Sequence, residues 1–101
     1  MNLVQILLPA YDNSGKRIPR KLFDQVREDL TDRFGGMTAY TRAPASGVWK
    51  QRGKTIRDEI VVFEVMAANL DRRWWKNYRR KLERLFKQES IVVRSQTVRL
   101  L

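Results

Sequence analysis

One carboxylate stands inside an otherwise apolar strand sequence, and its type and position suit it to chemistry. Glu64 interrupts the apolar run at 60–66. A carboxylate that is removed from water needs a partner, because an unpaired buried charge is costly and tends to be neutralised by a proton. Glu64 would therefore either form a structural ion pair or lie in a polar cavity, as a proton acceptor or a ligand anchor.

Polar side chains in the other strand sequences could approach Glu64 if the strand register brings them together. Arg42 and Arg94 are its candidate ion-pair partners, and Gln5 is the polar interruption of the first strand sequence. Trp49 stands beside the cations at 50, 52 and 54. An aromatic side chain in such a position could cover the sheet face, cap a pocket or stack a base. The candidate residues of a ligand pocket are Gln5, Tyr40, Arg42, Trp49, Glu64 and Arg94.

The amino-acid composition excludes several kinds of catalytic site. The chain contains no cysteine and no histidine, so it has no disulfide, no thiolate metal site and no nucleophile–histidine pair of its own. The acidic residues show no metal-ligand spacing, and the glycines lack the context of a phosphate loop. We therefore expect no catalytic constellation, no metal and no cofactor. A cofactor-independent enzyme would have to use Glu64 as its base, with Tyr40 or Arg42 polarising the substrate.

A second feature is the basic segment at 71–87, which holds eight of the 21 basic residues and one internal acid, Glu83. On a helix, like charges four residues apart destabilise by roughly 0.2–0.5 kcal/mol a pair. A basic face of this kind favours nucleic acid, an anionic membrane or an acidic protein surface. The candidate residues for such a partner are Arg72, Arg73, Lys76, Arg80, Arg84 and Lys87.

The alternative is a solvated basic face that is partly neutralised by the other predicted helix. That helix, at 19–34, carries four acidic side chains: Asp24, Glu28, Asp29 and Asp32. Both interpretations stay open on the sequence alone.

The predicted elements are strands at 3–8, 37–43, 56–66 and 90–100, with helices at 19–34 and 71–87, and a basic loop or hairpin extension at 48–54. Asp71 is the expected N-cap of the second helix. Trp74, Trp75 and Tyr78 recur at helical spacing, which favours core packing over base stacking. Glycines at 35 and 36 stop the first helix.

The order strand, helix, strand, strand, helix, strand is typical of an α+β ferredoxin-like βαββαβ domain. It predicts one domain over 1–101, with a four-stranded antiparallel sheet in the order 4-1-3-2 and two helices on one face. The open face would carry mostly apolar side chains: Leu3, Leu7, Ile60, Val62 and Met66. An exposed apolar face of this size marks an interface, so we expect a homodimer formed through the two sheets.

The segments RFGGMTAYTRAP at 33–44 and LDRRWW at 70–75 resemble a group of small uncharacterised bacterial proteins. The resemblance implies a ferredoxin-like domain, broadly similar to the dimeric α/β-barrel proteins, and brings no activity and no catalytic residues. The missing histidine departs from the haem-binding members of that class.

The leading prediction is a cytoplasmic homodimeric binding or interaction module without a membrane span, with a small-molecule pocket on the open sheet face. The alternatives are a nucleic-acid-binding protein using the basic helix 72–87 and a small cofactor-independent enzyme of the dimeric α/β-barrel type.

Overall fold

The computed structural model describes residues 1–42, 49–51, 54–56 and 59–101, with the side chains of 1–40 and 59–101. Six segments form the main architecture. Along the chain, two further short strands come between the second and the third strand of the main sheet. The elements in chain order are β1 (Asn2–Pro9), α1 (Arg20–Phe34), β2 (Thr38–Arg42), β3 (Trp49–Gln51), β4 (Lys54–Ile56), β5 (Ile60–Ala67), α2 (Arg72–Leu85) and β6 (Val92–Thr97).

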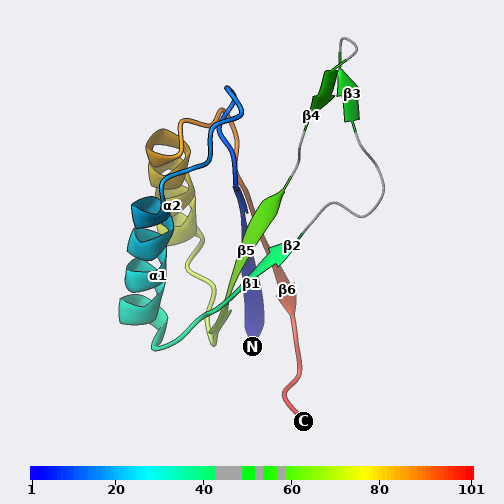
Figure 1. The fold of residues 1–101 in the computed structure, drawn as a ribbon. Coiled ribbons are helices and arrows are strands. Elements are labelled where there is room, and N and C mark those ends of the chain that lie inside the picture. The colour runs from blue at the N-terminus through cyan, green and yellow to red at the C-terminus, as the bar shows by residue number, and fades with distance from the viewer. Residues whose placement is uncertain (43–48, 52–53, 57–58) are drawn as a thin grey trace.

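The main sheet is antiparallel and runs in the order β2-β5-β1-β6. Both helices lie on one face of this sheet and leave the other face open (Figure 1). The four predicted strands correspond to β1, β2, β5 and β6. In their numbering the sheet order is 2-3-1-4, which is the predicted order 4-1-3-2 counted from the other edge, so the predicted ferredoxin-like topology is confirmed. The two central strands, β1 and β5, come from the two most continuously apolar sequences of the chain.

The strand predicted at 56–66 is two separate strands, which corrects that boundary. β4 ends at Ile56 and pairs with β3 as a small hairpin, whereas β5 begins at Ile60 and belongs to the main sheet. Three charged residues stand at 57–59, where they break the apolar pattern. The predicted hairpin extension is thus present as β3 and β4.

The core lies between the sheet and the helices, and it follows the alternation of the strands. Val4, Ile6 and Leu8 of β1 and Phe63 and Val65 of β5 are almost completely buried. Side chains two positions apart share a face of a strand, so these five point to the helix layer, away from the residues predicted for the open face. Burial of one such side chain contributes about 1.5–3 kcal/mol.

The start of α2 and the end of α1 lie where the sequence provides a signal. The Asp71 side chain accepts a hydrogen bond of 3.1 Å from the backbone amide of Trp74, which confirms the predicted N-cap of α2. Gly35 ends α1 in the left-handed conformation at φ 79°, and its N–H donates to the Thr31 carbonyl at 2.8 Å. A residue without a Cβ adopts this conformation at no steric cost.

Aromatic side chains join α2 to α1, so the core interpretation of the tryptophans is confirmed. The rings of Trp74 and Tyr78 stack with their centroids 4.8 Å apart, and Phe34 stacks on Trp75 at 5.4 Å. Leu85 differs from these aromatic residues of α2, because its side chain is 37% exposed. None of the helices in the described part of the chain is long and apolar enough to cross a membrane.

Candidate functional site

Strand register brings polar residues of three strands into one row on the open face. Gln5 lies opposite Glu64 in the β1–β5 ladder and opposite Arg94 in the β1–β6 ladder. Directly opposite residues of antiparallel strands point to the same face. Tyr40 joins this row from β2, where its position is opposite Val62, two residues before Glu64 in the chain.

A chain of hydrogen bonds connects these four side chains. Gln5 donates from Nε2 to Glu64 Oε1 at 2.6 Å, and the Tyr40 hydroxyl donates to the same oxygen at 2.8 Å. Arg94 donates from Nε to Gln5 Oε1 at 2.8 Å. The amide of Gln5 therefore stands between the guanidinium and the carboxylate, with its oxygen toward the cation and its nitrogen toward the anion.

This arrangement differs from the predicted direct ion pair between Glu64 and Arg94. Both residues lie opposite Gln5, one in each neighbouring strand, so the central strand separates them and the amide spans the gap. The side chain of Arg42, the other predicted partner, lies outside the described residues. Gln5 and Glu64 are half-buried, while Tyr40 is 40% exposed and Arg94 is exposed, so the network is accessible from the open face.

Apolar side chains surround the polar row. Leu3 and Leu7 flank Gln5 along β1 and are half-buried, and Val92 on β6 is 51% exposed. Val62 is buried although its position points to the open face, since Tyr40 and Leu7 lie directly opposite it. The face thus combines one charged, hydrogen-bonded row with an apolar border.

Two predicted pocket residues are not brought into the row by sheet pairing. Arg42 ends β2 opposite Ile60, and Trp49 lies in β3 opposite Ile56. The strand β3 pairs with β4 and not with the main sheet. The side chains of Arg42 and Trp49 lie outside the described residues, so their part in the pocket stays a prediction.

The basic residues of α2 point in more than one direction. The six predicted candidates, Arg72, Arg73, Lys76, Arg80, Arg84 and Lys87, are all exposed, and Lys87 lies just beyond the helix with φ 52°. At 100° per residue, Arg72, Lys76 and Arg79 share the flank next to the core, whereas Arg73, Arg80 and Arg84 point outward. Arg79 was absent from the predicted set, although the helical spacing alone places it beside Arg72 and Lys76.

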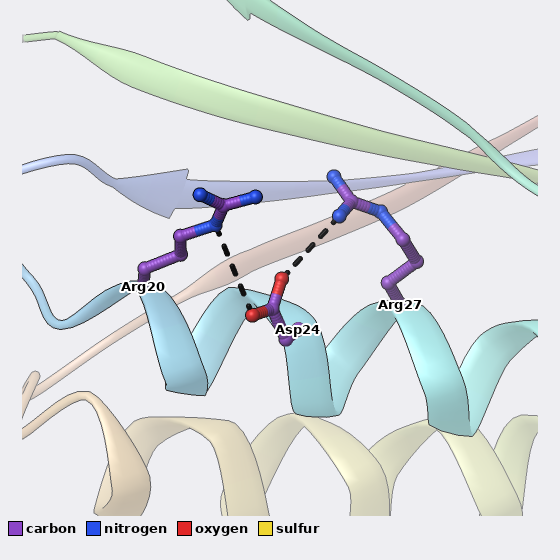
Figure 2. A network of polar contacts seen from close by, with 3 residues as sticks. All are labelled: Arg20, Asp24 and Arg27. Carbon is purple, nitrogen blue, oxygen red and sulfur yellow. Dashed lines mark hydrogen bonds and ion pairs between the residues drawn. The ribbon is translucent and has the colours of Figure 1, made fainter.

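Acidic residues of α1 neutralise only a small part of this charge. Asp29 pairs with Lys81 of α2 at 3.8 Å. Asp24 is instead engaged within α1, where Arg20 and Arg27 approach it from either side at 3.9 and 3.4 Å (Figure 2). Exposed pairs of this kind contribute about 0–1 kcal/mol. The predicted neutralisation between helices therefore occurs at Lys81, outside the six candidates.

A perturbed phenol lies between the two helices, at Tyr78. Burial, followed by the nearby Asp29 carboxylate and its hydrogen bond, raises the pKa of Tyr78 far above its ordinary value. Across the described residues, no group of three or more acidic side chains could hold a metal ion.

No model of a known protein family matches the chain, and no curated protein matches its sequence. Several solved structures are similar in fold. A phage SAM lyase in complex with S-methyl-5'-thioadenosine matches with a TM-score of 0.64 and 17% identity, over 94% of this chain and 79% of that one. CutA1 from Pyrococcus horikoshii OT3, in a mutant form, matches with a TM-score of 0.56 and 12% identity, over 100% and 86% of the two chains.

The PII-like protein CutA from Nostoc sp. PCC 7120 in its apo form matches with a TM-score of 0.54 and 10% identity, over 97% of this chain and 81% of that one. At these identities the similarity shows the ferredoxin-like fold alone. A binding module is compatible with this fold, which hosts proteins of different function.

Proposed function

We propose that the protein is a homodimeric small-molecule-binding protein whose ligand site lies between two facing sheets. The observation that carries this proposal is the Arg94–Gln5–Glu64–Tyr40 hydrogen-bond network on a half-exposed, otherwise apolar face. Ligand sites are mostly apolar surfaces with a few convergent polar groups that fix the orientation of the ligand. The open face has this composition.

The hydrogen bonds of the network leave capacity for a ligand. Within the described residues, both bonds to Glu64 end on Oε1, so Oε2 is available to accept from a ligand donor. Arg94 uses Nε toward Gln5, so its terminal nitrogens can donate to a ligand acceptor. The site therefore suits a ligand that carries a donor and an acceptor on a flat or apolar body.

Adenine nucleosides have this chemistry, since the adenine ring presents donors and acceptors on one edge of a flat aromatic body. The similar phage SAM lyase was solved with such a compound, S-methyl-5'-thioadenosine. We infer that a nucleoside of this kind is the ligand class to test. The ring of Tyr40 and the side chain of Leu7 would contact its faces.

Dimerisation through the open faces would enclose the site. Val92 and Met66 are exposed on this face, and a standard protein–protein interface buries about 800 Å² per partner. A second sheet placed over the first would cover these side chains together with the polar row. The apolar border supports a partner of the same kind, because two copies would bring the same composition to the interface.

Sedimentation and calorimetry test the two parts of the proposal separately. We expect a dimer at micromolar concentration that V92R dissociates, whereas L85R, a similar change on an exposed leucine of α2, leaves the dimer intact. S-methyl-5'-thioadenosine is expected to bind the wild type, and E64Q and Y40F are expected to weaken binding about tenfold, which corresponds to about 1.4 kcal/mol. The matched control is Q96A, two positions from Arg94 on the same strand.

A wild-type monomer at micromolar concentration would contradict the dimer. Equal binding by the wild type, E64Q and Y40F would contradict the site.

Nucleic-acid binding is a second candidate, favoured by the exposed basic residues on the outward side of α2. No carboxylate in the described part of the chain pairs with Arg73, Arg80 or Arg84. Several phosphate contacts would give a steep loss of affinity with salt. Titration of a single-stranded oligonucleotide at 50 and 200 mM salt measures this loss, and a flat response would exclude the candidate.

A further inference from the structure

A cleft lies between helix α2 and the edge strand β6, and Arg94 of the open-face network also lines it. Its volume is about 240 Å³. The apolar part of its lining is Val4, Leu70, Trp75 and Val93. The cationic part is Arg94 of β6 together with three cations of α2, Arg72, Lys76 and Arg79. Val4 and Trp75 are buried, and Leu70 and Val93 are half-buried, so packing against the core fixes the apolar lining.

The three cations lie on one flank of α2 because their spacing is four and three residues. In the part of the chain that the structure describes, no carboxylate forms an ion pair with any of them. The other side of α2 differs, since Lys81 there pairs with Asp29. Three cations that share a small apolar cleft repel one another, and an anion between them relieves this repulsion.

The one acidic residue of α2 does not neutralise the cleft. Glu83 lies one turn beyond Arg79 on the same flank, but its Oε2 accepts a hydrogen bond of 2.9 Å from the backbone amide of Ile91. Glu83 is absent from the lining of the cleft. The carboxylate is thus engaged in fixing the chain before β6, and the cleft keeps its positive charge.

We propose that this cleft binds a small organic phosphate. Arg72, Lys76 and Arg79 would hold the phosphate, for which guanidinium and ammonium groups are the usual side-chain donors. Trp75 and Val93 would contact the apolar part of the ligand. The volume lies below the usual range of drug-sized pockets, roughly 300–1,000 Å³, so the cleft suits a phosphate with a small apolar group.

The outward residues of α2 provide matched controls, because R73Q, R80Q and R84Q remove the same charge from the same helix without touching the cleft. Calorimetric titration would use phenyl phosphate and inorganic phosphate as probes at fixed ionic strength. We expect phenyl phosphate to bind more tightly than inorganic phosphate, because only the ester also contacts the apolar lining. R72Q, K76Q and R79Q are each expected to weaken phenyl phosphate binding about tenfold, and the controls less than about twofold.

A steric variant tests the cleft without a change of charge. Ser95 is exposed and lines the cleft, so S95W would fill it while leaving all three cations in place, and binding of phenyl phosphate should be lost. Circular dichroism would establish that each variant keeps its fold.

Three results would overturn the proposal. The first is that the cleft variants and the control variants weaken the binding of phenyl phosphate equally, which would indicate diffuse attraction to a basic surface. The second is equal affinity for phenyl phosphate and inorganic phosphate. The third is that neither phosphate binds at millimolar concentration, while an oligonucleotide binds through Arg73, Arg80 and Arg84.

Discussion

The hydroxyl of Tyr78 donates a hydrogen bond of 3.1 Å to the carboxylate of Asp29 and thereby joins helix α2 to helix α1. Asp29 also accepts a hydrogen bond of 2.9 Å from Gln25 and pairs with Lys81 at 3.8 Å. One carboxylate thus satisfies the hydroxyl that Tyr78 brings between the helices. A buried hydroxyl without such a partner would be destabilising.

The raised pKa of Tyr78 predicts a loss of stability at alkaline pH. Tyr78 stays protonated in the folded protein, whereas in the unfolded chain it ionises near its ordinary pKa of about 10. Its contribution is therefore fully present below about pH 10 and is lost as the pH rises further, with a slope of up to about 1.4 kcal/mol per pH unit. Urea unfolding of the wild type and Y78F between pH 9 and 11 measures the difference. Parallel pH profiles would contradict the prediction.

Asp71 has two contacts that substitution can separate. Its side chain caps α2 through the Trp74 amide and pairs with Arg33 at 3.7 Å. D71A removes both and should lower the free energy of unfolding by about 1 kcal/mol, whereas D71S keeps the cap and should lower it by only a few tenths. Chemical denaturation checks both values. Equal losses in the two variants would show that the cap contributes little.

Glu83 fixes the chain where it enters the last strand. Its Oε2 accepts from the Ile91 amide at 2.9 Å, and E83A would leave that amide without its partner. Hydrogen exchange at Ile91 should then become at least about tenfold faster, because removing a hydrogen bond to a charged group costs about 1.5–3 kcal/mol. E83Q keeps an acceptor oxygen and should show a smaller effect. Unchanged exchange at Ile91 in E83A would contradict this contact.

The position of Gln5 predicts a pH-dependent variant. Q5E would place a second carboxylate beside Glu64, and two adjacent carboxylates disfavour their joint ionisation, which raises the pKa of the pair in the folded state. Arg94, which bonds to position 5, reduces this effect without removing it. The variant should match the wild type most closely below the unfolded pKa of glutamate, about 4.3, and lose stability as the pH rises above it. Thermal unfolding between pH 4 and 8 measures this. Q96E, on the same face opposite Leu3, should show a smaller dependence.

The fold could be predicted because its signals are local. The strand alternation placed Val4, Ile6 and Leu8 on the helix side, and the acid at 71 before an aromatic pair placed the start of α2. The Gln5 bridge could not be predicted in this form, because it depends on the register of three strands that are far apart in sequence. Register follows from the hydrophobic pattern and the turn geometry together.

The cleft between α2 and β6 could not be predicted from the sequence alone. The spacing of Arg72, Lys76 and Arg79 is visible in the sequence, but their role depends on which strand lies beside α2. Because the sequence predicted one continuous basic face, it did not separate the flank beside β6 from the outward side.

Strand β6 forms part of both candidate sites through successive positions. Arg94 bonds to Gln5 on the open face and also borders the cleft beside α2, which Val93 and Ser95 line as well. A slip of one residue would exchange these faces and would remove both sites at once. The Glu83–Ile91 contact before the strand and the hydrogen bond of 2.9 Å from Val98 N–H to the Met1 carbonyl after it hold the strand at both ends. Both candidate sites therefore depend on the alignment of this one edge strand, and displacing it at either end would disable the two surfaces together.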